Sequence, residues 1–369
     1  MLTIEGCRAR QERFRARLAA ARLEAAVITD PRDVYYLTGL LPASFPVCLY
    51  LPAAGDSLLI CHTDAGEVAV ADRLTYETNT LYTLNPDPLA RLAGVLEQRL
   101  AGMAHVSRLG WQAEALPRRL GDLFAAALRP DAWAPVDAIL GDLQQRKDPD
   151  EIALLRRANA INLAAYAAAE QAIAPGVSEL EVLAAAHRAA TLAAGEPIQL
   201  GGDYRSGAFG GPARARTIEA GELYIIDSGV CYRGYWSDLA RTFAVGEPTA
   251  LQRSVYAHVA AVLTELPDQI RPGRDGSDLW RWMDARLREH PHLAERGLVT
   301  HGGHGIGTRV HEMPDVNRDR GGVLATGAVI TCEPGGYSDE LRAGIRLENA
   351  FLITEQGVEN LSPYPLALA

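Results

Sequence analysis

Hydrophobic positions along the first 140 residues fall into short segments that alternate between helical and strand-like spacing. Apolar residues at helical spacing, with arginines between them, predict an amphipathic helix over residues 8–26. The β-forming run 26–29 follows and ends at the turn residues Asp30-Pro31. Further strands are predicted at 47–51 and 57–61, and further helices at 88–101 and 116–128. This alternation is typical of a layered α/β domain.

A polar stretch with one proline, residues 144–150, is the predicted boundary between two domains, 1–143 and 144–369. Asp148 or Asp150 is expected to cap the long Ala/Leu-rich helix that follows and extends to about Ile173. Ser178, with Glu181 three positions later, has the pattern of a capping box and starts another helix. Beyond residue 200 glycines become frequent and strands carry carboxylates, so we expect the chemistry there.

The second domain contains a predicted hairpin with an acid on each strand. Residues 222–227 form a β-rich run that ends in Asp227, and the returning run 235–243 carries Asp238. A turn at 231–234 would place the two carboxylates directly opposite each other on one face. Facing carboxylates repel, and a bound cation removes that repulsion; a solvated pair, or a pair bridged to arginine, is the alternative.

A second predicted hairpin has the same unusual composition. The β-rich run 328–333 ends in Glu333, and the returning run 344–354 carries Glu348 among apolar neighbours. An acid in an apolar strand has to be paired, protonated or bound to a metal. The glycine-rich segment 300–307 lies between the two hairpins in sequence. We interpret its His304 as a functional residue and its His301 as a structural histidine, whereas His311, just beyond it, is interpreted as functional.

The four hairpin acids supply four negative charges, which two divalent cations would balance, and His304 adds a neutral nitrogen. Oxygen ligands with one imidazole suit Mn²⁺, Co²⁺ or Zn²⁺. Two such ions about 3.5–4 Å apart lower the pKa of a shared water and polarise the carbonyl that it attacks. The pattern therefore predicts hydrolysis at neutral pH.

These motifs resemble the M24-type metallopeptidase family of Xaa-Pro dipeptidases (prolidases), aminopeptidase P, methionine aminopeptidase and creatinase. The matching segments are IIDSG, GYWSDLARTF, GHGIG, VHEMP, TCEPG and GIRLENAFLIT. RLEAAVITDPRDVYYLTGL is similar to the N-terminal domain of the prolidase and aminopeptidase P branch, and KDPDEIALLRRA to the entry of its catalytic domain. The resemblance implies an α/β (α+β) chain with an N-terminal creatinase-like α/β domain and a C-terminal pita-bread catalytic domain.

The resemblance also implies roles for particular residues. Two divalent ions per subunit (Mn, Co or Zn) would be held by Asp227, Asp238, His304, Glu333 and Glu348. Glu333 would serve as acid and base for the water between them, with His304 and His311 completing the catalytic set. His311, Arg346 and Tyr337 would contact a short peptide substrate, for which Xaa-Pro dipeptides are the first candidates. A homodimer is implied as well.

One segment departs from the family pattern. A histidine expected about a dozen residues before the first metal-binding strand is missing, because Gly210 or Gly211 occupies its position. Arg205, or else Arg214 or Arg216, is the candidate for holding a substrate carboxylate instead. The departure leaves the proline preference and the recognised peptide end open. An aminopeptidase P-like or carboxypeptidase-like exopeptidase, a silent peptide-binding module and a metal-independent creatinase-type hydrolase are the alternatives.

Charge and cysteine content limit the possible binding partners and the cellular compartment. A net charge of −10 is unfavourable for binding nucleic acid. The single lysine, Lys147, leaves one candidate for Schiff-base chemistry, and no P-loop signature occurs. Five cysteines without a CxxC pair are typical of free thiols in a reducing compartment. No apolar run approaches the ~20 residues of a membrane helix. We therefore expect a cytoplasmic protein with neither a nucleic-acid nor a membrane partner.

Overall fold

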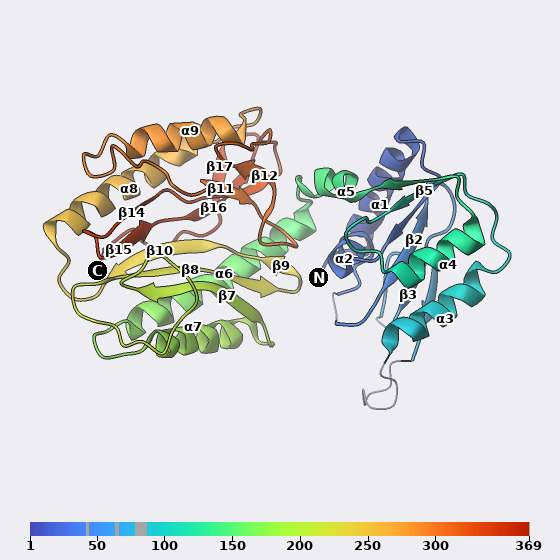
Figure 1. The fold of residues 1–369 in the computed structure, drawn as a ribbon, viewed down its shortest axis with the longest axis horizontal. Coiled ribbons are helices and arrows are strands. Elements are labelled where there is room, and N and C mark those ends of the chain that lie inside the picture. The colour runs from blue at the N-terminus through green and yellow to red at the C-terminus, as the bar shows by residue number, and fades with distance from the viewer. Residues whose placement is uncertain (42–43, 63–65, 78–86, 369) are drawn as a thin grey trace. The chain divides into compact units, whose positions relative to one another are not determined.

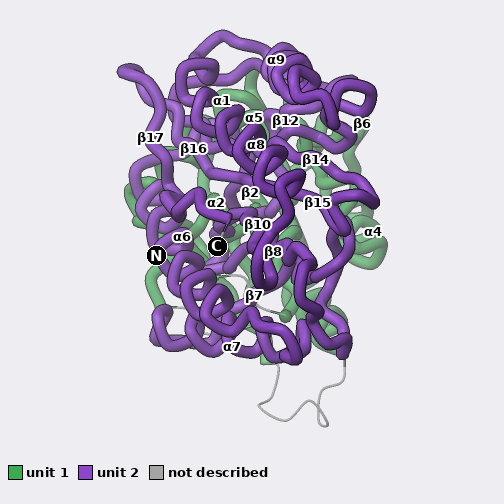
Figure 2. The backbone as a smooth tube through the Cα atoms, turned by 90° about the vertical axis from the view of Figure 1, so that its left-hand side faces the viewer, with its two compact units in different colours: residues 1–144 green, residues 145–369 purple. Residues whose placement is uncertain are grey.

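The computed structural model describes residues 1–41, 44–62, 66–77 and 87–368 (Figure 1). Within these ranges the chain forms two compact units, Met1–Gln144 and Gln145–Ala369, which Figure 2 distinguishes by colour. Each unit has its own sheet structure and its own hydrophobic core. Among the helices in these ranges, none has the length together with the apolar character that a membrane crossing requires.

A mixed six-stranded sheet, in the order β4-β3-β2-β1-β5-β6, forms the centre of the first unit. Alternate residues of the central strand β1 (Ala25–Ile28) face opposite helical layers, so every residue of the strand is buried. One layer consists of α1 (Ile4–Ala20), α2 (Pro31–Thr38) and α5 (Asp137–Gln144), the other of α3 (Pro88–Leu100) and α4 (Arg118–Leu128). The remaining strands are β2 (Cys48–Pro52), β3 (Leu58–Cys61), β4 (Asp72–Thr75), β5 (Arg108–Trp111) and β6 (Ala132–Pro135).

The first predicted helix is wrong at its C-terminal end. It begins after Thr3, whose side chain accepts a hydrogen bond from the Gly6 N–H, and it ends at Ala20. Arg22 then adopts a φ of 58°, which turns the chain into β1, so residues 25–26 belong to the sheet. The strands and helices predicted between residues 47 and 128 are confirmed to within two residues at each end.

The strands of the second unit form two main sheets, and its long helices cover the outer faces of these sheets (Figure 1). One sheet has the order β10-β8-β7, with β9 paired to β8, and packs against α6 and α7. The other has the order β12-β11-β13-β16-β17 and shares a hydrophobic core with α8 and α9. A hairpin of β14 and β15 completes the unit.

The bounds of these elements are as follows. The first sheet and its helices comprise α6 (Pro149–Ala172), α7 (Glu179–Ala194), β7 (Gln199–Ser206), β8 (Leu223–Tyr232), β9 (Tyr235–Trp236) and β10 (Leu239–Ala244). The second part comprises α8 (Ala250–Gln269), α9 (Gly276–Leu287), β11 (Gly303–Gly305), β12 (Glu312–Val316), β13 (Val329–Cys332), β14 (Gly335–Ser338), β15 (Ala343–Arg346), β16 (Asn349–Ile353) and β17 (Val358–Asn360).

The predicted starts of α6 and α7 are confirmed. Asp148 is the N-cap of α6, and its backbone N–H donates to Glu151 Oε2 at 2.8 Å. Ser178 caps α7 by accepting from the Glu181 N–H, and the Ser178 N–H donates to the Glu181 carboxylate in return. These reciprocal bonds satisfy amide groups that have no partner inside the helix. Because they join residues only three positions apart, the capping pattern can be recognised in the sequence.

The register predicted for the first acidic hairpin is wrong by two residues. The turn consists of Arg233 and Gly234, both with positive φ (47° and 83°), so Tyr232 pairs with Tyr235. Asp227 consequently pairs with Ala240 instead of Asp238, and β8 continues past Asp227 to Tyr232. Asp238 lies two positions before Ala240, so the two acids are diagonal neighbours on the same face.

The second acidic hairpin keeps one pairing register, although its strand pairing is briefly interrupted. Cys332 pairs with Asn349 in β13 and β16, and Gly335 pairs with Arg346 in β14 and β15. The register is the same on both sides of the interruption, and the Leu347 N–H donates to the Pro334 carbonyl between them. Glu333 therefore lies opposite Glu348.

Candidate metal centre

A cavity of about 410 Å³ in the second unit brings most of the predicted site residues together. The predicted residues that line it are Asp227, Asp238, His304, His311, Glu333, Arg346 and Glu348. They come from both hairpins and from the glycine-rich segment, which are far apart in sequence. Tyr337 is not among the lining residues and reaches the cavity through Arg346, to which its hydroxyl is hydrogen-bonded.

Three of these side chains form the tightest group. Each of Asp238, His304 and Glu348 offers one ligand atom, and the three atoms lie within 4.8 Å of one another. His304 Nε2 is 3.7 Å from Asp238 Oδ2 and 4.0 Å from Glu333 Oε1. His304 Nδ1 is 3.0 Å from the Gly305 carbonyl oxygen, a contact that favours the proton on Nδ1 and leaves the Nε2 lone pair toward the acids.

Burial strongly perturbs the carboxyl groups. It raises the pKa of Asp227 to about 6 and the pKa values of Asp238 and Glu348 well above their ordinary range, and neighbouring carboxylates add to each increase. Burial also lowers the pKa of His304 to about 4, so its imidazole is neutral at pH 7. In water-excluded surroundings, such a concentration of acids is unfavourable without cations nearby.

The donor set fits divalent cations. Glu348 is 1% exposed, yet its Oε1 atom has no hydrogen-bond partner. Within the described part of the chain, Arg346 is the one arginine or lysine that pairs with any of the four acids, and it pairs with Asp227. Carboxylate oxygens that are buried, crowded and incompletely bonded, beside one neutral imidazole, are a ligand set for a hard or borderline metal ion.

Arg346 is fixed by partners on several sides. Its Nη1 atom donates to Asp227 and to Asp203, the latter at 3.1 Å. Its Nε atom donates to the Tyr337 hydroxyl at 2.7 Å, and the guanidinium carbon lies 5.7 Å from the centre of the Tyr337 ring. Burial raises the pKa of Tyr337 to about 12, so this hydroxyl keeps its proton at neutral pH.

His301 lies in the cavity wall, although the sequence led us to interpret it as a structural histidine. Its Nδ1 atom is 3.1 Å from Glu333 Oε1, and that carboxylate raises the pKa of His301. His311 lies beside it, with its ring 5.5 Å from that of His301 and 3.9 Å from that of His304. Burial and the nearby His301 lower the pKa of His311.

The loop that carries His311 is held by a buried ion pair. Lys147 Nζ is 2.9 Å from Glu312 Oε2, and the two side chains are 1% and 7% exposed. Glu312 Oε1 also accepts from the Thr308 hydroxyl and the Arg309 N–H. Burial alone would raise the pKa of Glu312, but Lys147 holds it below its ordinary value. The chain's single lysine therefore anchors this loop.

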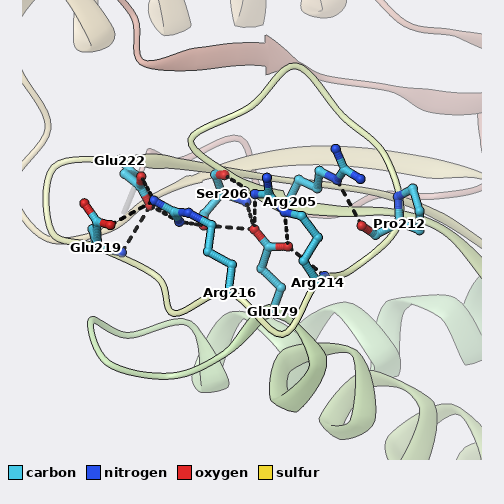
Figure 3. Close-up of polar contacts among 8 residues, drawn as sticks. All are labelled: Glu179, Arg205, Ser206, Pro212, Arg214, Arg216, Glu219 and Glu222. Carbon is cyan, nitrogen blue, oxygen red and sulfur yellow. Dashed lines mark hydrogen bonds and ion pairs between the residues drawn. The ribbon is translucent and has the colours of Figure 1, made fainter.

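The three arginine candidates for substrate binding lie in different surroundings (Figure 3). Arg214 pairs with the buried Glu179 at 2.6 Å, and Arg216 pairs with Glu222 at 2.5 Å. None of the three arginines is among the residues that line the cavity. Through their glutamate partners, Arg214 and Arg216 stabilise the segment between β7 and β8. Arg205 precedes Ser206 on β7, and its Nε atom donates to the Pro212 carbonyl at 2.9 Å (Figure 3).

Sequence reasoning missed Asp203, which lines the cavity and pairs directly with Asp227 across β7 and β8. No strand was predicted over β7, because its glycines at 201 and 202 interrupt the β-forming residues. A weak signal was present. Asp203 and Arg205 alternate with the buried Tyr204 and Ser206, as expected for a strand with one polar face.

The fold and this cavity together define a class of protein. Buried acids and histidines with perturbed pKa values, gathered in one cavity of an α/β domain, are typical of metal-dependent hydrolases. Residues 153–355 match the model of metallopeptidase family M24, and residues 10–143 match that of the creatinase/prolidase N-terminal domain. The chain therefore belongs to metallopeptidase family M24.

Particular relatives extend this assignment over the whole chain. The sequence is 29% identical over 348 residues to the Xaa-Pro dipeptidase of Pyrococcus horikoshii, covering 92% of this chain and 93% of that protein. It is 30% identical over 369 residues to the uncharacterized peptidase YqhT of Bacillus subtilis, covering 97% and 98%. The structure of the Xaa-Pro dipeptidase from Bacillus anthracis superposes with a TM-score of 0.82 at 22% identity, covering 98% and 99%. The predicted creatinase-like and pita-bread fold is confirmed.

Proposed function

We propose that this protein hydrolyses short peptides, Xaa-Pro dipeptides first among them, with two divalent cations per subunit. The observation that carries the proposal is the excess of buried carboxylates over cationic partners in one cavity. The ligands proposed are Asp227, Asp238, His304, Glu333 and Glu348. When bound, such a pair of ions lowers the pKa of a water and polarises the scissile carbonyl. Manganese is our first choice, with cobalt and zinc as the alternatives.

The chain's own residues move and hold protons around the substrate. Glu333 accepts a proton from the attacking water and returns it to the leaving nitrogen, and the nearby imidazole of His301 stabilises its charge. His311 binds the substrate close to the scissile amide. Arg346, held by Tyr337, orients the Asp227 carboxylate and forms the pocket wall beside it. The short distances among these side chains in the cavity support these roles.

Arg205 is the residue that we propose for the free carboxylate of the substrate. It lies on the same face of β7 as the cavity-lining Asp203. In the described part of the chain its Nη1 and Nη2 atoms have no hydrogen bond or ion pair, whereas Arg214 and Arg216 are each paired with glutamate. An arginine with two free donors is suited to bidentate binding of a carboxylate.

We also propose that the protein is a cytoplasmic homodimer. The five cysteines are all free, as expected in a reducing compartment. The dimer rests on the resemblance to the family alone, and the molecular mass in solution tests it directly.

The function is tested with protein stripped of metal and reloaded separately with Mn²⁺, Co²⁺ or Zn²⁺. Each form receives a mixture of Xaa-Pro dipeptides, Xaa-Pro-Yaa tripeptides and proline-free peptides, and mass spectrometry identifies the products. We expect metal-dependent loss of the Xaa-Pro dipeptides, and the variants Asp238→Ala and Glu348→Ala should be inactive in the same assay.

Other outcomes would change the assignment. Release of the first residue from the tripeptides would indicate an aminopeptidase P-like enzyme, as in the X-Pro aminopeptidase of Thermotoga maritima, whose fold this chain shares. Activity that persists in both variants, or without metal, would contradict the proposed metal centre. Binding of peptide without any cleavage would indicate a silent peptide-binding module.

A further inference from the structure

A fifth carboxylate, that of Asp203, lies in the cavity beside the four proposed ligands. Its Cα pairs with that of Asp227 in the β7 and β8 ladder, so the two acids are direct cross-strand neighbours. Like charges at such positions destabilise a sheet unless a cation lies between them. Here Arg346 Nη1 bonds to Oδ2 of both acids, at 3.1 Å for Asp203.

The position of Asp203 is restricted from the other side by Gly210. This glycine has a φ of +145°, and a Cβ atom placed on it would overlap Asp203 Oδ2 and lie 3.2 Å from Arg346 Nη2. The preceding residue, Phe209, accepts a hydrogen bond from Arg346 Nη2 through its carbonyl oxygen at 3.4 Å. The loop between β7 and β8 therefore packs its backbone onto the Asp203–Arg346 pair, with no side chain between them.

The charges show what this arrangement achieves. Two divalent cations are balanced by the four ligand carboxylates alone, and Arg346 adds one positive charge in contact with Asp227. Without a further anion, that charge would weaken the hold of Asp227 on a cation through Coulomb repulsion. Asp203 supplies one negative charge on the same guanidinium nitrogen and restores the balance.

We propose that Asp203 is a positioning residue that holds Arg346 and offsets its charge, so that Asp227 remains an effective cation ligand. The proposal rests on the proposed function, because it requires a cation at Asp227. It assigns to β7 an electrostatic role in the metal centre and explains why glycine stands at position 210.

The test measures Mn²⁺ binding to metal-stripped protein by isothermal titration calorimetry, which does not depend on activity. Asp203→Asn should bind Mn²⁺ about tenfold or more weakly than the wild type, because Arg346 would lose the carboxylate that holds it and offsets its charge and would then oppose a cation at Asp227. Asp319→Asn is the matched control, since it removes the same charge from an exposed ion pair with Arg318. It should bind Mn²⁺ as the wild type does.

A second variant disturbs Asp203 without changing its charge. Gly210→Ala inserts a methyl group against the carboxylate and should also weaken Mn²⁺ binding. Gly357→Ala is its control, because Gly357 has nearly the same φ, +142°, with no atom within 4 Å of an added Cβ. Gly357→Ala should leave Mn²⁺ binding unchanged, which separates backbone strain from contact with Asp203.

Coupling to Arg346 is the decisive readout. If Asp203 acts through Arg346, Asp203→Asn should have little effect on Mn²⁺ affinity in an Arg346→Met background. An equal loss in both backgrounds would overturn the positioning role, and so would wild-type affinity in Asp203→Asn and Gly210→Ala. Failure of the wild-type protein itself to bind Mn²⁺ would instead contradict the proposed function.

Discussion

Asp203 and Arg205 lie two positions apart on β7, so their side chains leave the same face of the strand. Asp203 lines the cavity beside Arg346, whereas Arg205 lies outside the cavity lining, where its Nε atom donates to the Pro212 carbonyl. In the proposed function, the free carboxylate of a peptide would be attracted to Arg205 and repelled by Asp203. At the scale of single residues, the role proposed for β7 is therefore to orient the substrate as well as to form part of the sheet.

Replacing Arg205 with glutamine tests that orientation. Loss of a charge-assisted bond worth about 1.5–3 kcal/mol should raise KM for dipeptides roughly tenfold to a hundredfold. A substrate whose carboxylate is blocked as an amide should be cleaved equally by Arg205→Gln and the wild type. Steady-state kinetics on the matched free and amidated peptides checks this expectation.

The control for that experiment is Arg318→Gln, which removes an exposed arginine paired with Asp319. It should leave KM for both peptides unchanged. Equal losses on the free and the amidated peptide in Arg205→Gln would show that Arg205 does not read the carboxylate.

The site residues differ in how readily the sequence reveals them. Glu333 and Glu348 stand out because an acid among apolar strand residues needs a partner wherever the strand lies. Asp203 does not, because two glycines precede it and its importance depends on pairing with Asp227, which is a property of the folded sheet. His301 has only one local cue, its place in the glycine-rich segment, and its contact with Glu333 joins separate elements.

At the scale of elements, a two-residue turn determines how the acids of the first hairpin meet. Arg233 and Gly234 both have positive φ, the geometry of the tight turns that match strand twist. Arginine rarely adopts this conformation, so the sequence favoured a longer turn and a register shifted by two. The face on which Asp227 and Asp238 lie was nevertheless predicted correctly, because a shift of two residues preserves the alternation.

The segment between β7 and β8 is tied to the N-terminus of α7 by Arg214 and Glu179 (Figure 3). Glu179 has no exposed side-chain surface, and it also accepts from the N–H and hydroxyl of Ser206. Burial alone would raise the pKa of Glu179, but Arg214 and the Ser206 amide hold it below its ordinary value. The stabilisation is therefore complete above the ordinary pKa of about 4.3 and is lost as the pH falls through the lower, folded-state value.

Arg214→Ala should lower the free energy of unfolding by roughly 2–4 kcal/mol at pH 7, because it leaves the buried Glu179 carboxylate without its cation. The deficit relative to the wild type should shrink as the pH is lowered, because without Arg214 burial raises the pKa of Glu179 and favours its protonation in the variant, whereas the wild type loses its own stabilisation below the ordinary pKa. Urea unfolding at several pH values measures both effects.

Arg156→Ala provides the comparison, because Arg156 and Glu359 form an ion pair whose side chains are 53% and 41% exposed. It should cost less than about 1 kcal/mol at every pH. A deficit in Arg214→Ala that is equally small, or that does not change with pH, would contradict the role assigned to the buried carboxylate.

At the scale of the whole molecule, every proposed metal ligand belongs to the unit Gln145–Ala369. Metal binding should therefore stabilise that unit, by about 2.7 kcal/mol when the free ion is a hundred times its Kd. Removing metal with a chelator should speed hydrogen exchange in β8, β10, β13 and β16, where the ligands lie in or beside the strands.

The unit Met1–Gln144 serves as the internal control for that measurement. Its central strand β1 and the helices on either side should exchange at the same rate with and without metal, as read by mass spectrometry of proteolytic fragments. Equal acceleration in both units would contradict a metal centre confined to the second one.

The overall architecture could be predicted from the sequence, because the sequence patterns that indicate it are local. Caps such as Ser178 with Glu181, alternating periodicities, and acids in apolar strands each depend on a few neighbouring residues. The end of α1 and the strand β7 could not be predicted in this way. The positive φ of Arg22 and the strand conformation of the glycines in β7 depend on the sheets that these residues join. Local patterns thus predicted the elements, and the sheets determined how they meet.

The burial of Lys147 also has a practical consequence. Reagents that acylate amines have a single lysine to attack in this chain, and its Nζ atom is enclosed with Glu312. Acylation of Lys147 requires the ion pair with Glu312 to open. The rate of acylation therefore reports how often the loop that carries His311 opens. A lysine-specific protease likewise has one cleavage point, between Lys147 and Asp148, three residues beyond the boundary of the two units. The chain thus carries a built-in chemical reporter of its own local unfolding.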